Sequence, residues 1–241
     1  LRLTTLKAPP FELLQADPAR VGRTSLHQGG VVDTPSGEWW GFSMMDYNSV
    51  GRLTCLSPVT WREGWPYFGL PGNLKRTPRI WVKPDTGASQ PPAPLFERND
   101  DFSGPRLNPL WQWSQVPDDS RWSLSERPGW LRLHALPADS FWWARNTLTQ
   151  RAIGPQSTAT VELDAAGMLD GDVAGLALSN YPYAWIGVRR DAGQLIVTQY
   201  EQLTESTTRV AINSARLWLR AHCDFLTERA EFSYSVDGHT F

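Results

Sequence analysis

The chain has 241 residues, a formal net charge of −2 at pH 7 and a sequence pI near 6.1. This balance, without any run of Lys and Arg, excludes the basic surface that binding to nucleic acid or an anionic membrane requires. No stretch approaches the roughly eighteen consecutive apolar residues of a transmembrane helix. The 13 Trp, 19 Gly and 19 Pro favour an all-β protein with many short strands joined by turns.

The first third of the chain predicts one antiparallel meander. Pro35-Ser36-Gly37 is a strong turn signal between the first two strands, and a loop at 47–49 follows the second. The four predicted strands cover 30–34, 38–46, 51–56 and 59–66. Because such a unit cannot bury both faces alone, we expect it to be one late blade of a β-propeller.

Residues 71–95 have a different composition, with six prolines and few apolar side chains. This composition is typical of a linker or an extended wrap between domains. We therefore divide the chain into residues 1–70, the C-terminal portion of a propeller domain; 71–95, a Pro-rich linker; and 96–241, a β-sandwich.

The last part of the chain predicts a sandwich because short runs with period-two alternation recur between turns. These runs cover 111–114, 122–124, 130–134, 158–163, 173–178, 184–189, 194–199, 216–223 and 230–236. Asp191-Ala192-Gly193 is the expected hairpin turn between two of them. The chain begins inside a predicted domain and stops at an Asp237-Gly238 turn, so both domains are expected to be truncated.

The two cysteines, Cys55 and Cys223, lie far apart in the sequence. We expect buried free thiols rather than a disulfide, and no Cys/His spacing suits zinc. Another unusual feature is Phe141-Trp142-Trp143. Alternation in a strand would place Phe141 and Trp143 in the core and Trp142 outward, where it could serve as a sugar platform or as ordinary packing.

Several carboxylates could be mistaken for catalytic acids. Asp33 and Glu38 flank the Pro-Ser-Gly turn, where solvated carboxylates are ordinary, and Asp46 lies on a predicted strand. Asp100 and Asp101 open the sandwich, where they could help to bind a structural calcium or could cap a turn.

An ordered set of motifs resembles glycoside hydrolase family 43. The segment 27–40, which begins His27-Gln28-Gly29-Gly30, resembles its late-blade segment, and 51–53 and 61–66 continue the match in the right order. The segments that resemble the C-terminal concanavalin-like sandwich of its β-xylosidase members are 101–104, 127–133, 144–151 and 170–176. The resemblance covers roughly residues 22–241.

The resemblance implies a five-bladed propeller whose pore holds the active site. Family members hydrolyse β-xylosides or α-arabinofuranosides with inversion, using two carboxylic groups about 6.5–9.5 Å apart. A third acid tunes the pKa of the proton donor. In the family these acids come from earlier blades, so we assign no catalytic residue here and expect the general acid and base upstream of Leu1. The implied partners are xylo-oligosaccharides or arabinose-substituted xylan fragments.

The family's binding residues carry over at His27, Gln28 and Arg52. His27 matches the pore histidine that contacts a central calcium or the water around it. Arg52 matches the arginine that reaches the terminal sugar and the pKa-tuning acid, and Gln28 is placed with them as substrate-binding. No cofactor is required; the possible metal sites are a pore calcium at His27 and a structural calcium at Asp101.

Two main hypotheses follow. The chain is a fragment of an exo-acting β-xylosidase or α-L-arabinofuranosidase, or it is a non-catalytic carbohydrate-binding protein with a lectin-like sandwich. A purely structural β module is a third reading, which would leave the match at His27 and Arg52 as coincidence. Neither the oligomeric state nor a cytoplasmic, periplasmic or secreted location follows from the sequence.

Overall fold

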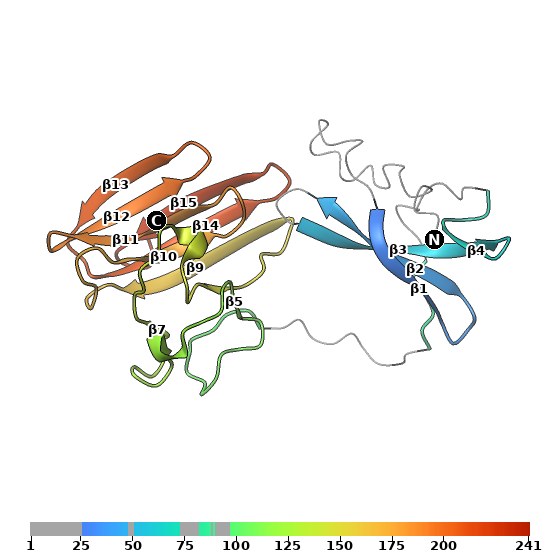
Figure 1. The fold of residues 1–241 in the computed structure, drawn as a ribbon, viewed down its shortest axis with the longest axis horizontal. Helices are drawn as coiled ribbons and strands as arrows, with labels where there is room; N and C mark the ends of the chain where they lie inside the picture. The colour runs from blue at the N-terminus through green and yellow to red at the C-terminus, as the bar shows by residue number, and fades with distance from the viewer. Residues whose placement is uncertain (1–25, 48–50, 73–81, 88, 90–96) are drawn as a thin grey trace. The chain divides into compact units, whose positions relative to one another are not determined.

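The structure is a computed structural model that describes residues 26–47, 51–72, 82–87, 89 and 97–241. The described residues confirm the all-β prediction, since strands dominate and the helices are short 3₁₀ turns (Figure 1). They form two compact units, one built on the first four strands and one on the strands from residue 112 onward. Within the described residues no helix has the length and apolar character needed to cross a membrane.

The first unit is the predicted four-stranded antiparallel meander, in the order β1-β2-β3-β4. Its strands are β1 (Leu26–Asp33), β2 (Trp39–Tyr47), β3 (Gly51–Arg62) and β4 (Trp65–Phe68). The predicted turn at Pro35-Ser36-Gly37 is confirmed, because Gly37 N donates to Thr34 O at 2.9 Å and Thr34 N donates to Glu38 O at 2.8 Å. The loop predicted at 47–49 lies largely outside the described residues.

The prediction of a separate strand over 59–66 is wrong. β3 runs without a break from Gly51 to Arg62, pairing with β2 as far as Pro58 and then, through its last four residues, with β4. The actual turn lies at Glu63 and Gly64, which have φ values of 52° and 77°. Two successive left-handed residues make a tight hairpin, so the segment 59–66 contains the end of one strand, a turn and the start of the next.

The meander buries one face and exposes apolar side chains on the other. On the buried face the Phe68 ring packs on Gly41, where an added Cβ would lie 2.8 Å from the ring, and Phe68 is 2% exposed. On the opposite face three large apolar side chains remain about half exposed: Val32, Phe42 and Leu56. An apolar face of this kind is expected of a propeller blade, which packs against its neighbours through both faces.

Only part of the predicted linker is described. Residues 82–87 and 89 form no strand, and Asp85 Oδ1 accepts a hydrogen bond from Gly87 N at 2.9 Å in a local turn. Residues 73–81, 88 and 90–96 lie outside the described residues, so the linker assignment to 71–95 stays a prediction.

The second unit holds two main antiparallel sheets, which Figure 1 shows as neighbouring layers, and two small two-stranded sheets. The first main sheet has the order β10 (Val173–Leu178), β11 (Ala184–Asp191), β12 (Gln194–Glu201), β13 (Ser206–Ile212). The second has the order β15 (Arg229–Ser235), β14 (Arg216–Asp224), β9 (Gln156–Asp164). The small sheets pair β5 (Gln112–Trp113) with β8 (Leu148–Thr149) and β6 (Trp122–Ser123) with β7 (Arg132–Leu133). The sandwich prediction is confirmed.

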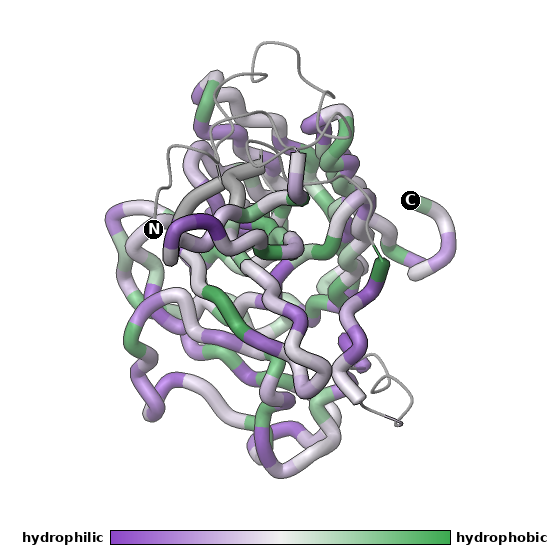
Figure 2. The backbone as a smooth tube through the Cα atoms, turned by 90° about the vertical axis from the view of Figure 1, so that its right-hand side faces the viewer, coloured by the Kyte–Doolittle hydropathy of each residue, from purple (hydrophilic) through white to green (hydrophobic). Residues whose placement is uncertain are grey.

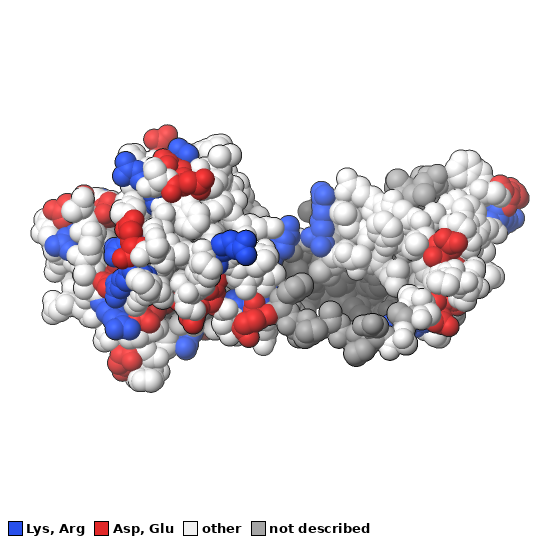
Figure 3. Space-filling view, turned by 90° about the horizontal axis from the view of Figure 1, so that it is seen from below, with Lys and Arg blue, Asp and Glu red and all other residues white. Residues whose placement is uncertain are grey.

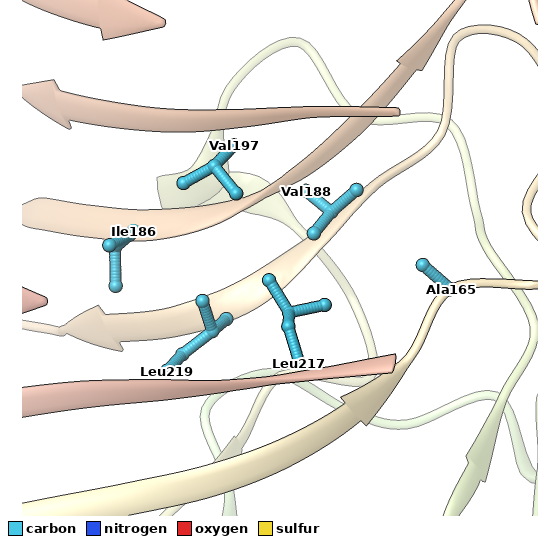
Figure 4. Close-up of a cluster of buried hydrophobic side chains, with 6 residues drawn as sticks. All are labelled: Ala165, Ile186, Val188, Val197, Leu217 and Leu219. Carbon is cyan, nitrogen blue, oxygen red and sulfur yellow. The ribbon is translucent and has the colours of Figure 1, made fainter. Parts of the chain in front are cut away.

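The sandwich core lies between the two main sheets. Alternate residues of β14, among them Leu217 and Leu219 at 0% exposure, face Ile186, Val188 and Val197 of the other sheet (Figure 4). Hydrophobic and hydrophilic residues are interspersed along the chain (Figure 2). Along β14 the buried positions alternate with more exposed ones, as expected when one face of a sheet is buried. Each fully buried aliphatic side chain contributes about 1.5–3 kcal/mol to stability.

The hairpin turn predicted between β11 and β12 is confirmed. Asp191 pairs with Gln194, and the two residues between them, Ala192 and Gly193, have φ values of 48° and 78°. This is the type I′ geometry that suits the twist of the flanking strands. Strands β8 and β13 were not predicted. β13 has six exposed residues among its seven, so its sequence lacks the apolar alternation that marks the other strands.

The interpretation of Phe141-Trp142-Trp143 as an alternating strand is wrong. These residues form a 3₁₀ turn, η5 (Phe141–Trp143), closed by hydrogen bonds from Trp143 N to Ser140 O and from Ala144 N to Phe141 O. Because a 3₁₀ turn does not alternate two faces, Trp143 is 63% exposed rather than buried, and Trp142 is 38% exposed. A second such turn, η4 (Asp119–Arg121), precedes β6.

Candidate functional site

The predicted binding residues lie at one end of the first meander. Arg52, at the start of β3, pairs with Asp46 of β2, and His27 of β1 pairs with Met44, which also pairs with Thr54 of β3. This register places the backbones of His27 and Arg52 at the same end of the sheet. The side chains of His27 and Asp46 lie outside the described residues.

A β-bulge shapes this end of β1. His27 pairs with Met44 and Gly29 pairs with Ser43, so Gln28 is an extra residue between them. Its φ of 47° is left-handed, which is uncommon for a residue other than glycine or asparagine. Bulges are frequent next to active sites, where they redirect a side chain.

Gly29 allows the bulged strand to approach β2 closely. A Cβ added at Gly29 would lie 1.9 Å from the Phe42 carbonyl oxygen, so no side chain fits there without moving the strand. The glycine that follows Gln28 is therefore required by the close approach of two backbones.

The bulge brings Gln28 to Arg52. Gln28 Oε1 accepts a hydrogen bond from Arg52 Nη1 at 3.2 Å, and the same nitrogen lies 3.9 Å from Met44 Sδ. Both Gln28 and Arg52 are exposed to solvent. A guanidinium is a planar fork of five N–H donors, which suits both carboxylates and sugar hydroxyls. Two of the three predicted binding side chains are thus in direct contact.

Asp33 and Glu38 belong to the other end of the meander. Asp33 pairs with Trp39 at the end of β1, and Glu38 closes the turn that follows. Both are exposed, and Glu38 Oε2 accepts a hydrogen bond from Asp85 N at 3.4 Å. Their position at a turn fits the expectation that they are solvated carboxylates rather than a catalytic pair.

The carboxylates of Asp100 and Asp101 act as turn caps. Asp100 Oδ1 accepts from Phe102 N at 2.8 Å, and Asp100 Oδ2 accepts from Trp111 Nε1 at 2.8 Å. Asp101 Oδ1 accepts from both the hydroxyl and the backbone N–H of Ser103, which holds the pKa of Asp101 below its ordinary value. Calcium needs six to eight oxygen ligands. Among the described residues, no three or more His, Cys, Asp or Glu side chains lie together in a way that could hold a metal ion. Calcium binding at Asp101 stays a prediction.

The cysteines are free, as expected. Cys55 lies in the first unit and Cys223 in the second, and both are buried. Burial raises the pKa of the Cys55 thiol to about 11 and also raises that of Cys223. A thiol whose ionisation is suppressed in this way is a structural group, not a nucleophile.

One residue that sequence reasoning missed, Asn146, organises the sandwich loops. It is 6% exposed, with a left-handed φ of 58°. Its side chain forms two hydrogen bonds to the backbone of Asp118, accepting from Asp118 N at 2.8 Å and donating to Asp118 O at 3.0 Å. Asn146 therefore joins the segment after η5 to the N-cap of η4. The only signal in the sequence was an asparagine, the residue type besides glycine that best tolerates this conformation.

A second structural group lies around Arg127. Its Nη1 donates to Asp164 Oδ2 at 2.6 Å, and its guanidinium lies 4.0 Å from the centroid of the Trp130 ring. A hydrogen bond from Ala166 N, followed by the contact with Arg127, lowers the pKa of Asp164. On the face of this unit that Figure 3 shows, acidic and basic side chains are interspersed.

The fold is thus a propeller-type meander followed by a concanavalin-like sandwich, the class of architecture found in carbohydrate-active enzymes. Residues 99–241 match the family described as the β-xylosidase C-terminal concanavalin A-like domain. The chain belongs to this family, the C-terminal domain of GH43 β-xylosidases.

The relatives agree with this assignment. A β-xylosidase from Formosa agariphila is 32% identical over 90% of this chain and 41% of the relative. A non-reducing-end α-L-arabinofuranosidase from Bacteroides ovatus is 34% identical over 45% of this chain and 21% of the relative. A solved bifunctional GH43-CE protein from Bacteroides eggerthii has a TM-score of 0.76 and 38% identity, covering 89% of this chain and 28% of that one. The chain spans less than half the length of the curated relatives it matches.

Proposed function

We propose that this chain forms the C-terminal part of an inverting glycosidase that removes terminal β-xylosyl or α-L-arabinofuranosyl residues from xylan fragments. The general acid and base come from outside the chain. The observation that carries the proposal is the contact between Gln28 and Arg52 at the bulged end of a blade-like meander. Family membership of the attached sandwich supports it.

Arg52 has the chemistry needed at the terminal sugar subsite. Inversion requires a base that activates water and an acid that protonates the leaving oxygen, about 6.5–9.5 Å apart. A guanidinium beside these groups holds a carboxylate in its ionised form and donates to sugar hydroxyls. Gln28 Oε1 accepts from Arg52 Nη1 and so fixes the direction of the guanidinium fork.

His27 is proposed to face the pore, at the register position next to the bulge. The neutral imidazole of a histidine can bind a metal ion or hydrogen-bond to metal-bound water. A calcium ion there would hold the water and sugar oxygens in place by charge, without any redox role. His27 would contact the ion or its hydration shell, and Asp101 is the separate candidate for a structural calcium.

The test compares this chain with a protein extended upstream to include the proposed catalytic blades. Hydrolysis of nitrophenyl β-xyloside and nitrophenyl α-L-arabinofuranoside is measured for both. We expect activity in the extended protein alone. Activity in the 241-residue chain would contradict the placement of the acids outside it, and Asp33 and Glu38 would then be the first residues to substitute. Glycan binding without hydrolysis in both proteins would favour the alternative of a non-catalytic carbohydrate-binding protein.

A further inference from the structure

A cluster of aromatic side chains covers part of the sandwich on the side away from its core. In β11 the core-facing positions are Ile186 and Val188, so Trp185, on the alternate position, lies on the opposite face of the sheet. Trp185 pairs with Tyr200 of β12, and their rings are 5.9 Å apart. The residues of this aromatic cluster are Phe141, Trp142, Tyr181, Tyr183, Trp185 and Tyr200.

Tyr183 is the buried centre of the cluster. It is 8% exposed, and its ring centroid lies 5.2 Å from that of Phe141 and 6.0 Å from that of Tyr200. The Trp142 ring stacks on Tyr183 with an interplanar angle of 16° and a centroid distance of 6.4 Å. Tyr181 meets Trp142 edge to face, at 5.6 Å and 81°. Trp142 is therefore packed against two aromatic rings before any ligand binds.

The outer members of the cluster are exposed to solvent. Trp142 is 38% exposed, Tyr181 is 67% exposed, and the adjoining Trp143 is 63% exposed. Exposed aromatic rings that are held rigidly by neighbouring rings lose little conformational entropy when a ligand stacks on them. Trp142 and Tyr181, which contact each other, are two such rings.

Polar groups gather at the edge of the cluster. Glu205 lies near the cluster, because its backbone N donates to Gln202 O at 3.4 Å. Desolvation, followed by the charges of Tyr183, Glu205 and Tyr181, raises the pKa of Tyr200. The Gln202 side chain is also there, since its Oε1 accepts from Tyr183 N at 3.4 Å. These groups donate and accept hydrogen bonds, as the hydroxyls of a sugar require.

Taking the substrate class from the proposed function, on which this inference rests, we propose that Trp142 and Tyr181 of the second unit form a secondary binding site for a neutral β-linked pentopyranose chain. The apolar C–H face of a xylopyranose ring would stack on Trp142, and Tyr181 would contact the next ring or its edge. The occupant is a polysaccharide because flat aromatic surfaces with hydroxyl and carboxylate groups at their edge match sugar rings, which present C–H faces and hydroxyl rims. The site holds substrate near the enzyme and takes no part in bond cleavage.

The test uses the 241-residue chain in affinity electrophoresis through gels containing soluble arabinoxylan, and titration with xylohexaose followed by Trp fluorescence. We expect Trp142→Ala and Tyr181→Ala to weaken binding about tenfold or more, as the loss of one stacked ring predicts. Tyr181→Phe, which keeps the ring, should retain most of the binding. The matched control is Trp65→Ala, because Trp65 is 47% exposed on β4 and lies outside the cluster. Far-UV circular dichroism checks that each variant is folded.

Three results would overturn the proposal. One is an unmodified chain that neither slows in the arabinoxylan gel nor responds to xylohexaose. The second is a loss of binding as large in Trp65→Ala as in Trp142→Ala. The third is a dimer, detected by sedimentation, that Trp142→Ala dissociates without affecting glycan binding, which would make the cluster a self-association surface. In the extended enzyme, we expect Trp142→Ala to raise KM for polymeric arabinoxylan and to leave kcat/KM for nitrophenyl xyloside unchanged. Because the small substrate tests catalysis alone, failure of the secondary site is distinguishable from failure of the catalytic proposal.

Discussion

Replacing Asn146 should destabilise the sandwich through two separable effects. Asn146 is 6% exposed, forms two hydrogen bonds to the backbone of Asp118, and has a φ of 58°. Asn146→Ala removes both hydrogen bonds and also places a residue with a Cβ and no polar side chain in the left-handed region. Asn146→Gly removes the same hydrogen bonds but tolerates the backbone conformation.

The expected magnitudes follow from these two effects. Two net hydrogen bonds at about 0.5–1.5 kcal/mol each give about 1–3 kcal/mol. The left-handed conformation adds about 1 kcal/mol for alanine. We therefore expect Asn146→Ala to lower the free energy of unfolding by about 2–4 kcal/mol, and Asn146→Gly by about 1 kcal/mol less.

Urea unfolding followed by circular dichroism measures both variants, with Asn213→Ala as the control because Asn213 is exposed. The control should change the free energy of unfolding by less than about 0.5 kcal/mol. A cost below about 0.5 kcal/mol for Asn146→Ala would refute the structural role assigned to this residue. Equal costs for the alanine and glycine variants would refute the contribution from the backbone conformation.

Gly29→Ala should destabilise the first unit by about 2 kcal/mol or more, because the new Cβ would lie 1.9 Å from the Phe42 carbonyl oxygen. An unchanged free energy of unfolding of this unit, measured by equilibrium unfolding, would contradict the close approach of the two strands. Cys55 should react slowly with a thiol reagent at about pH 8 until urea is added, since its thiolate is scarce when the pKa is about 11. A Cys55 thiol that reacts as fast in the folded chain as in the unfolded chain would count against its burial. Because the folded thiol holds its proton more tightly, the contribution of Cys55 to the free energy of unfolding is present below the ordinary thiol pKa of 9.0 and is lost as the pH rises towards 11. The pKa of Asp164 is lowered, so its contribution to the free energy of unfolding is present above the ordinary carboxyl pKa of 3.8 and is lost as the pH falls. Asp164→Asn should therefore weaken the acid dependence of unfolding, and an unchanged acid dependence would contradict this assignment.

The strand pattern of the sandwich could be predicted where one face of a strand is buried. The predicted bounds 173–178 coincide with β10, and β14 shows the expected alternation through Leu217 and Leu219. β13 escaped prediction because its Ser, Thr and Arg side chains are mostly exposed and its pairing is set by the hairpin from β12. Hydrophobic periodicity cannot identify a strand that buries so little.

The local geometry of the candidate site could not be predicted from the sequence. The motif placed Gln28 and Arg52 in one site, but the left-handed bulge that brings their side chains together follows from the backbone register between β1 and β2. The prediction of a strand at η5 (Phe141–Trp143) was wrong because three consecutive aromatic residues resemble a buried strand. There, two local backbone hydrogen bonds and the aromatic partners Tyr181 and Tyr183 decide the conformation.

The most direct test of the proposed function is kcat/KM for nitrophenyl β-xyloside in the upstream-extended protein carrying Arg52→Ala. Arg62→Ala is the matched control, because Arg62 is an exposed arginine of the same strand whose ion pair is with the neighbouring Glu63 at 3.9 Å. We expect Arg52→Ala to lower kcat/KM about a hundredfold or more, since charge-assisted donors near a transition state contribute about 3 kcal/mol. Arg62→Ala should leave it within about twofold, as expected for an exposed surface pair. An Arg52→Ala enzyme as active as the Arg62→Ala enzyme would contradict the proposal that Arg52 acts on the sugar.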